Sequence, residues 1–428
     1  MALDAPAIAV MTLAALLLAV GLKAALWSGP GTESHAEFYG SKYTLGWLAM
    51  YTLLASAVVL SVGSVSDLVI AALLALPLLS RCISAAMHLL AGSLTRVEPG
   101  ADAYPATVGG TLTCILVSRN EPSDVMNMTL DSVLRSPRPG PIQVISIDNS
   151  DSRHLAELDA WRQHLHGISL AHPDVETVFE HVEHDELKPG NLDRAIRRAT
   201  GDYILLADVD STFSSDIEWI ESAIQKLRSE SDLAFVQLRV LPTNTHFNAL
   251  TDGIGRYQYL HNLTDYVGAL DGFALFKGHN AVWARAALLD RGSWVSRLQG
   301  RVILAEDLLK TCEVYANGAR GCVIWAKSGE WLPASYASFA SMWRRWLYGT
   351  WQTLIIVLRG GHFFRLSRLQ QFELLRRQQF AGSGLPYILT ILGILRPSVV
   401  MIPYLLAILG HLIVGLLVRH RSLSLRIV

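Results

Sequence analysis

Two aspartates, one residue apart, follow an apolar segment near the middle of the chain. Residues 203–207 have the composition of a buried strand, and Asp208 and Asp210 come at its end. In a parallel sheet, ligands bind at the carboxyl ends of the strands. Two carboxylates buried there are costly unless a cation joins them. A divalent metal held between this pair and a phosphate explains the pattern, and a helix-capping loop in the cap-rich stretch 210–216 also explains it.

Carboxylates also follow two other predicted strands. A strand expected at 112–117 is followed by Asn120 and Glu121, and a second, at 142–148, ends in Asp148. The other elements expected in this region are helices at 124–136, 154–166 and 191–199 and a strand at 233–240. Strands that alternate with helices predict an α/β domain with a parallel sheet. The acidic strand ends should then share one rim of that sheet.

The composition points to a membrane protein with an ordinary soluble middle region. The chain has 428 residues, a formal net charge of −1 and a mean hydropathy of +0.31. A charge so close to zero argues against a nucleic-acid-binding protein, which needs an excess of basic residues. The four cysteines show no CxxC spacing and are expected to be free thiols in a reducing compartment: Cys82, Cys114, Cys312 and Cys322.

Apolar runs at both ends of the chain predict membrane spans. Residues 6–27 and 44–63 each reach the ~20 residues that cross a bilayer. A run at 65–79 contains a charge and a proline, so two or three opening spans remain possible. Two closing runs, at 385–395 and 398–418, precede a basic tail. Because basic flanks stay cytoplasmic, we expect an integral protein of the plasma (inner) membrane with a cytoplasmic middle region.

The segment before the closing runs is rich in arginine and aromatic residues. Between 340 and 380 there is one acid, Glu373, against seven arginines: 344, 345, 359, 365, 368, 376 and 377. Tryptophans and phenylalanines are interleaved with them. This composition predicts amphipathic helices in the membrane interface, with arginines near lipid phosphates. DNA binding by the same mixture is disfavoured, because the segment adjoins predicted membrane helices.

Seven short stretches, taken in order, resemble the membrane-embedded inverting glycosyltransferases of family 2. This family includes cellulose, hyaluronan, chitin and poly-N-acetylglucosamine synthases and ceramide glucosyltransferase. The resemblance covers about residues 110–352. The stretches are VSRNEPSDVMNMTLDSVL, VISIDNSD, LKPGNLDRAI, LLADVDS, FKGHNAVWARAAL, AEDLLKTCEVYANGARG and SMWRRWLYGTWQ. No single stretch is specific, but their order on one α/β domain between membrane segments is a strong signal.

The resemblance implies a GT-A (Rossmann-like) α/β cytoplasmic domain with N- and C-terminal transmembrane helices and interfacial amphipathic helices. The expected organisation is transmembrane segments at 1–95, the GT-A domain at 105–338, interfacial helices at 339–382 and a transmembrane hairpin with a basic tail at 383–428. The expected cofactor is Mg²⁺ or Mn²⁺, because carboxylates and phosphate oxygens suit both ions.

The resemblance also implies a role for individual residues. Asp307 is expected to be the catalytic base, with Glu306 beside it, and an acid in a helix's first turn is the structural alternative. The other expected roles are metal binding by Asp210 and Asp208, donor binding by Glu121, Asp148, Lys188, Asp208 and Arg345, and acceptor binding by Trp346, Gly278 and His279. Met342 departs from the family, which has a glutamine at this position. His279 stands where the family has a small hydroxyl residue, and a neutral histidine there could either hydrogen-bond the acceptor or be a satisfied buried side chain.

The resemblance implies a metal-dependent hexosyltransferase. It would take a sugar from a nucleotide-diphosphate donor, expected to be UDP-linked, and transfer it with inversion to a glycan or lipid acceptor at the membrane. Processive synthesis and export of a β-linked extracellular polysaccharide is the leading expectation. The alternatives are a single transfer to a lipid, and a non-catalytic transporter or scaffold with a degenerate transferase domain. The sequence predicts no oligomeric state.

Overall fold

The structure, a computed structural model, describes residues 110–377 except 139, 184–185, 216–218, 256–257, 259–272 and 291. Residues 101–377 form one compact unit of the chain. The predicted transmembrane segments at 1–95 and 383–428, and residues 378–382 of the interfacial region, lie outside the described residues. Within the described part, no helix is both long and apolar enough to cross a membrane.

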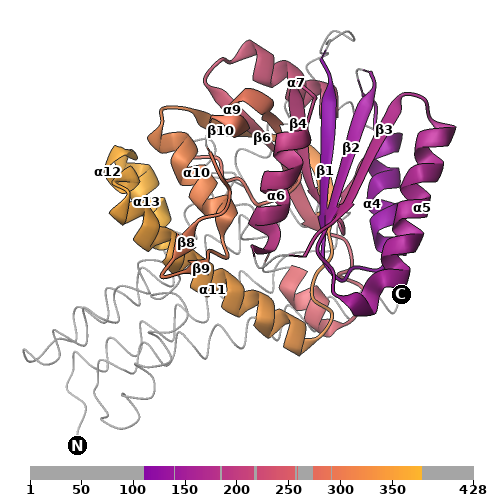
Figure 1. Ribbon diagram of the computed structural model, residues 1–428. Helices are drawn as coiled ribbons and strands as arrows, with labels where there is room; N and C mark the ends of the chain where they lie inside the picture. Colours follow the sequence, from indigo (N-terminus) through magenta and orange to yellow (C-terminus); the bar gives the residue numbers. More distant parts are fainter. Residues whose placement is uncertain are drawn as a thin grey trace, which may run out of the picture. The chain divides into compact units, whose positions relative to one another are not determined.

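The core of this unit is a twisted sheet of eight strands (Figure 1). The strands are β1 (Leu112–Ser118), β2 (Ile142–Asp148), β3 (Val175–His181), β4 (Tyr203–Asp208), β5 (Thr212–Phe213), β6 (Leu233–Pro242), β7 (Ala281–Ala284) and β10 (Arg320–Glu330). Their order in the sheet is β3-β2-β1-β4-β7-β6-β10-β5. A separate antiparallel pair joins β8 (Arg297–Leu298) and β9 (Arg301–Val302).

The strand register brings the acidic strand ends together. Strand β1 pairs in parallel with both β2 and β4, so that Ser118 lies beside Asp148 and Val117 beside Asp208. The prediction of a parallel sheet holds for β1 to β4 but not for β7, which runs antiparallel between β4 and β6. Strands β4 and β6 still point the same way.

Four strands of this sheet were missing from the sequence prediction: β3, β5, β7 and β10. Strand β3 is at the edge of the sheet and is half-buried along most of its length, so it carries glutamates and a histidine among its apolar residues. Such a mixture lacks the continuous apolar run of a central parallel strand. Strand β10 pairs in parallel with β6, and its end, Glu330, lies beside Pro242 at the end of β6.

The helices are α4 (Ser123–Arg135), α5 (Leu155–Ala171), α6 (Leu187–Arg198), α7 (Trp219–Ser229), α9 (Arg285–Leu289), α10 (Glu306–Ala316), α11 (Tyr336–Arg359), α12 (His362–Arg365) and α13 (Arg368–Arg376), with a 3₁₀ turn at Ser152–His154. The predicted helices at 124–136, 154–166 and 191–199 correspond to α4, α5 and α6. Helix α6 starts earlier than predicted, because Pro189 lies in its first turn, where a missing N–H is tolerated.

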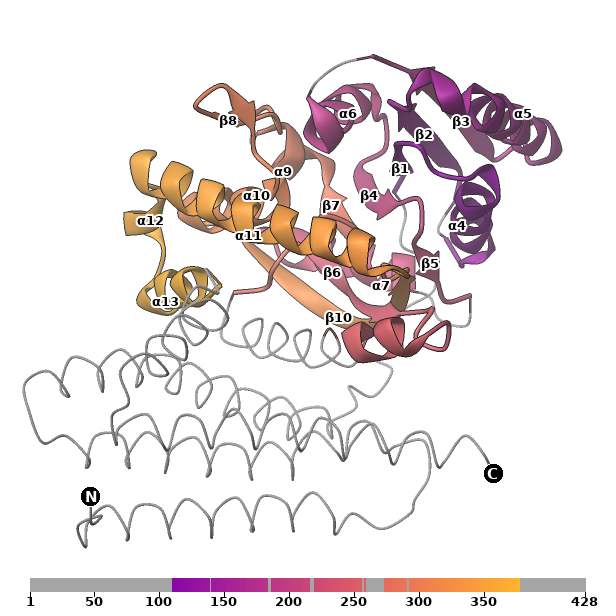
Figure 2. The same ribbon diagram turned by 90° about the horizontal axis from the view of Figure 1, so that it is seen from below.

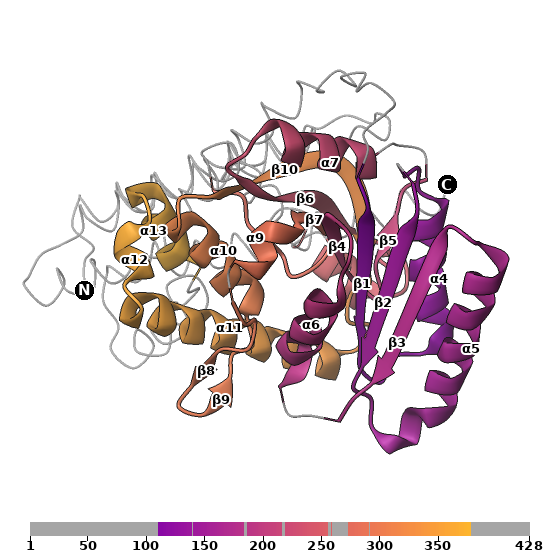
Figure 3. The same cartoon turned by 45° about the horizontal axis from the view of Figure 1, so that its top comes forward.

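Both faces of the sheet are covered by helices, as alternate residues of β1 show. Ile115 and Val117 belong to a core with α6, α10 and α11, whereas Cys114 and Leu116 belong to a core with α4, α5 and α7. Figure 3 shows α6 on one side of the strands and α4 and α5 on the other. Helix α11 packs against α10 (Figure 2). The sheet, including the carboxyl ends of its parallel strands, therefore lies between two layers of helices.

Two glycine-to-alanine substitutions test this packing. One is expected to destabilise the protein and the other to stabilise it. A Cβ on Gly201 would lie 2.6 Å from the backbone nitrogen of Thr113 in β1, and a strand backbone cannot move aside. We expect Gly201→Ala to destabilise the protein by about 1–3 kcal/mol. Gly167, on an exposed part of α5, has no atom within 4 Å of such a Cβ. Gly167→Ala should stabilise by about 0.5–1 kcal/mol. Unfolding midpoints of the full chain check both, and a shift of the same sign for the two variants contradicts the packing.

Candidate functional site

The loop that carries the aspartate pair is fixed by the helix that packs beneath it. Asp208 is the last residue of β4, and Asp210 follows in the next turn. The hydroxyl of Thr129, in α4, lies 2.5 Å from the carbonyl oxygen of Val209 and 2.7 Å from that of Ser211. Thr129 therefore anchors Val209 and Ser211, the residues on either side of Asp210, to helix α4. The aspartate side chains are left to face the rim of the sheet.

Lys188 forms an ion pair with Asp208 at the centre of the site. Its Nζ is 2.5 Å from Oδ1 of Asp208. Burial alone would raise the pKa of Asp208, but Lys188 and His279 hold it below its ordinary value. Burial and the charge of Asp208 raise the pKa of Asp210 to about 6. The two aspartates therefore differ in basicity because Asp208 pairs with Lys188, whereas Asp210 is exposed to the negative charge of Asp208.

His279 pairs with a carboxylate that the sequence analysis did not identify. Its Nε2 lies 3.1 Å from Oε2 of Glu330, at the end of β10, and Gln258 donates to the other oxygen of the same carboxylate. Although burial disfavours the charged ring, the carboxylates of Asp208 and Glu330 raise the pKa of His279 to about 9. His279 is therefore a cation at neutral pH, which differs from the neutral histidine expected from the sequence.

The turn before β7 brings the predicted base close to the lysine. A Cβ on Gly278 would lie 3.4 Å from Oδ2 of Asp307 and 3.6 Å from Nζ of Lys188, so both groups flank this glycine. The backbone there is left-handed, with φ of 84° at Gly278 and 54° at Asn280. The side chain of Gln237 fixes the turn, since its Nε2 donates to the carbonyls of His279 and Asn280 at 3.0 Å.

Two adjacent acids begin helix α10 at this point. Burial, with a contribution from Asp307, raises the pKa of Glu306 to about 7 against the opposing charge of Lys188. Burial also raises the pKa of Asp307, so that its carboxylate is a stronger base than an exposed aspartate. The buried hydroxyl of Thr311 donates to the carbonyl of Asp307 and accepts from the N–H of Phe276, which ties α10 to the turn before β7.

Asp148 is completely buried at the end of β2. Its carboxylate accepts from the hydroxyl of Ser118 at 2.6 Å, from the N–H and hydroxyl of Ser150 at 2.7 and 2.8 Å, and lies 3.0 Å from Nδ1 of His181. A carboxylate has about four acceptor positions. Contact with a nucleobase would therefore require one of these donors to be displaced.

The pKa of Glu121, which follows β1, is raised to about 7. Burial is the largest cause, and the charges of Asp210, Asp208 and Asp148 add to it.

Helix α11 carries the predicted arginine and tryptophan. Arg345 is within electrostatic reach of the site, because its charge lowers the pKa of Asp208. Trp346 is 37% exposed, and its ring centre lies 6.0 Å from that of Trp343. Met342, which replaces the expected glutamine, is half-buried.

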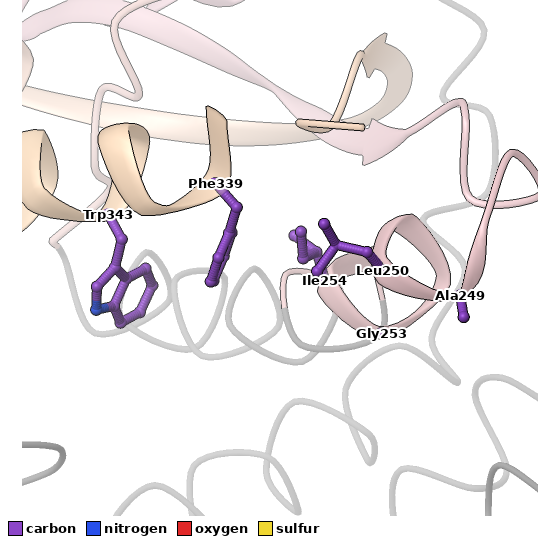
Figure 4. Close-up of a pocket in the computed structure, with 6 residues that line it drawn as sticks. All are labelled: Ala249, Leu250, Gly253, Ile254, Phe339 and Trp343. Atoms are coloured by element: carbon purple, nitrogen blue, oxygen red, sulfur yellow. The ribbon is translucent and has the colours of Figure 1, made fainter. Parts of the chain in front are cut away.

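An apolar hollow of about 360 Å³ lies beside the same helix (Figure 4). It is lined by Ala249, Leu250, Gly253, Ile254, Phe339 and Trp343. Its lining in the described part of the chain is apolar and suits an apolar group better than an anionic ligand. Figure 4 shows the rings of Phe339 and Trp343 extending from α11 on one side and the short helix at 249–255 on the other.

The site fits a hard divalent cation through oxygen donors. Asp208 and Asp210 provide two carboxylates, which are ligands that Mg²⁺ and Mn²⁺ prefer. Among the described residues, no group of three or more histidine, cysteine or acidic side chains could hold a metal by itself. Any remaining ligands would then come from phosphate oxygens or water.

The structure thus brings together most of the residues predicted from the sequence. Those that share this rim, by contact or by their electrostatic effect on one another, are Glu121, Asp148, Lys188, Asp208, Asp210, Gly278, His279, Glu306, Asp307 and Arg345. Glu330 and the supporting Gln237 were missed. Glu330 would have been found if β10 had been predicted, because its carboxyl end reaches the same rim.

Metal binding should weaken at acidic pH. Because the pKa of Asp210 is raised to about 6, its carboxylate is ionised at pH 7.5 and mostly protonated at pH 5. A proton that competes for this ligand should reduce the affinity for Mn²⁺ by about tenfold over that interval. Electron paramagnetic resonance of free Mn²⁺ with the full chain measures this. Asp210→Asn should lose the binding and Asp159→Asn, on the exposed side of α5, should keep it. Equal binding by both variants would rule out this site.

Comparison with known proteins gives a family-model match for part of the chain and similar folds among solved structures. Residues 113–288 match the family model of "Glycosyl transferase family 2". Among solved structures, the mannosyltransferase PcManGT from Pyrobaculum calidifontis, in complex with GDP-Man and Mn²⁺, is 17% identical with a TM-score of 0.55, over 82% of this chain and 92% of that one. Residues 1–349 of S. aureus TarS, in complex with UDP-GlcNAc, are 15% identical with a TM-score of 0.40, over 69% of this chain and 78% of that one. The first of these two likenesses concerns the fold alone. The match to the family model lies in residues 113–288, the region that contains Asp208 and Asp210.

Proposed function

We propose that this protein is an inverting, metal-dependent hexosyltransferase that uses a nucleotide-diphosphate sugar. One observation carries the proposal: the Cβ position of Gly278 lies 3.4 Å from Oδ2 of Asp307 and 3.6 Å from Nζ of Lys188, and Lys188 is paired with Asp208. The predicted base and the predicted metal ligands therefore face one small volume. An acceptor hydroxyl and a sugar diphosphate that meet there would be within reach of both.

The transfer is a single displacement at C1 of the donor sugar. The carboxylate of Asp307 accepts the proton of the acceptor hydroxyl as its oxygen attacks C1. The bond between C1 and the diphosphate oxygen breaks, and the electron pair leaves with the diphosphate. Attack opposite the leaving group inverts the anomeric centre. Lys188, Arg345 and the protonated His279 lie where they can stabilise the negative charge that develops on the diphosphate.

Asp210 and Asp208 would hold the metal ion, which supplies Lewis-acid stabilisation of the leaving diphosphate when bound. The Mn²⁺ in the PcManGT complex supports a divalent ion of this kind. The donor-binding part of the site would be formed by Glu121 and Asp148 at the ends of β1 and β2. A UDP-sugar is the proposed donor, in line with the sequence resemblance.

The acceptor is proposed to be membrane-associated. Helix α11 has exposed aromatic side chains on its surface, among them Trp346, Tyr348 and Trp351, together with arginines. Such a mixture suits the membrane interface. The proposed location is the inner membrane with the catalytic domain on the cytoplasmic side. Processive synthesis and export of a β-linked polysaccharide is the favoured reaction. The apolar hollow beside α11 favours the second candidate, transfer of one sugar to a lipid.

Loss of the base should stop the chemistry without preventing donor binding. We expect Asp307→Asn to lower kcat for UDP release from UDP-sugars by about 10²–10⁴-fold, the usual contribution of a general base. UDP binding, measured by calorimetry with Mn²⁺, should stay within a few fold. Asp131→Asn, in α4, is the control and should be fully active. Full activity of Asp307→Asn would exclude Asp307 as the base.

The size of the product separates the two acceptor classes. If the enzyme is processive, detergent-solubilised full chain supplied with a radiolabelled UDP-sugar should give a ladder of glycan lengths on a gel. A single species that extracts into organic solvent would show transfer to a lipid instead. Release of UDP without either product would contradict both candidates.

A further inference from the structure

Helix α11 packs against and hydrogen-bonds residues 304–305, which directly precede the two acids that begin α10. Gly349 packs directly on this segment, since a Cβ there would lie 2.8 Å from Cβ and 2.9 Å from the backbone nitrogen of Ala305. The side chain of Gln352 accepts a hydrogen bond from the N–H of Leu304 at 3.1 Å. The hydroxyl of Thr353 donates to the carbonyl of Ala305 at 3.1 Å. We call these three residues of α11 the clasp.

The clasp acts on the residues immediately before the predicted base. Ala305 is the N-cap of α10, and its carbonyl also accepts the N–H of Leu309. Asp307 is only two residues further on. A shift of residues 304–305 would therefore move the first turn of α10, and with it the Asp307 carboxylate, away from Gly278.

The clasp shares one face of α11 with Arg345. Gly349, Gln352 and Thr353 follow Arg345 at intervals of four, seven and eight residues, which is the spacing of a single helical stripe. Arg345 acts electrostatically on Asp208. One helix face thus both carries the arginine and holds the backbone next to the base.

The polar side chains of the clasp are buried, which indicates that they have a specific role in this contact. Gln352 is 2% exposed and Thr353 is completely buried. The Nε2 of Gln352 has no hydrogen-bond partner among the described residues, and burying such a donor is unfavourable. A leucine of similar size would avoid that cost but could not accept the N–H of Leu304. Packing alone does not explain a glutamine here.

We propose that Gln352 and Thr353 are positioning residues, which keep Asp307 on α10 and Arg345 on α11 in one fixed arrangement around the donor. This inference rests on the proposed function. Because misplacement of a reacting group is costly, loss of the clasp affects the rate of transfer more than the binding of the donor.

The test compares two threonines of the same helix. Thr353→Val removes the hydroxyl that reaches Ala305. Thr350→Val removes a hydroxyl whose partner, among the described residues, is the carbonyl of Leu347 within α11. We expect Thr353→Val and Gln352→Leu to lower kcat for UDP release by about ten- to a hundredfold, with KM for the UDP-sugar within twofold. Thr353→Ser should restore kcat, and Thr350→Val should match the wild-type chain.

Hydrogen exchange supplies a readout that does not depend on activity. In Gln352→Leu, the amide of Leu304 should exchange faster than in the wild-type chain, because its acceptor is gone. Equal kcat for Thr353→Val and Thr350→Val, or a fall in kcat that Thr353→Ser does not restore, would overturn the positioning role. If the wild-type chain releases no UDP from any UDP-sugar, the proposed function fails instead.

Discussion

The ion pair between Lys188 and Asp208 holds together a group of buried and half-buried carboxylates that would otherwise repel one another. The positive charge of Lys188 acts on Glu306 and Asp307 as well as on Asp208, and their combined effect raises the pKa of the lysine against its burial. Acids from two separate parts of the chain, the end of β4 and the start of α10, are thus tolerated in one place. Without this cation the first turn of α10 could not lie so close to the end of β4.

The balance of charge around this pair explains why the site suits a cation and a diphosphate together. The carboxylates at the rim are Glu121, Asp148, Asp208, Asp210, Glu306, Asp307 and Glu330, against the cations Lys188, His279 and Arg345. This excess of negative charge favours a divalent ion. The cations lie on the other elements, where they can meet the phosphate oxygens. The same arrangement makes Asp210 and Glu306 weaker acids than usual.

The supporting hydrogen bonds explain how loops can hold such a cluster. Thr129 fixes the loop after β4, Gln237 fixes the turn before β7, and Thr311 joins that turn to α10. Each of these side chains comes from a helix or strand in the packed core. The clasp on α11 extends the same principle to the helix that carries Arg345. Side chains from helices and strands thereby hold the loops and turns that carry the charged groups of the site.

The sequence alone determined the α/β class, the strands β1, β2 and β4, and the acids at their ends, because apolar runs that stop at carboxylates are local patterns. The order of the motifs also predicted Asp307 as the base and Arg345 as a donor-binding residue. The tertiary structure decided the antiparallel insertion of β7, the pairing of His279 with Glu330 and the saturation of Asp148 by Ser118, Ser150 and His181. Those features depend on contacts between residues distant in the chain, and the charge of a buried histidine or aspartate is set by such neighbours rather than by its own type.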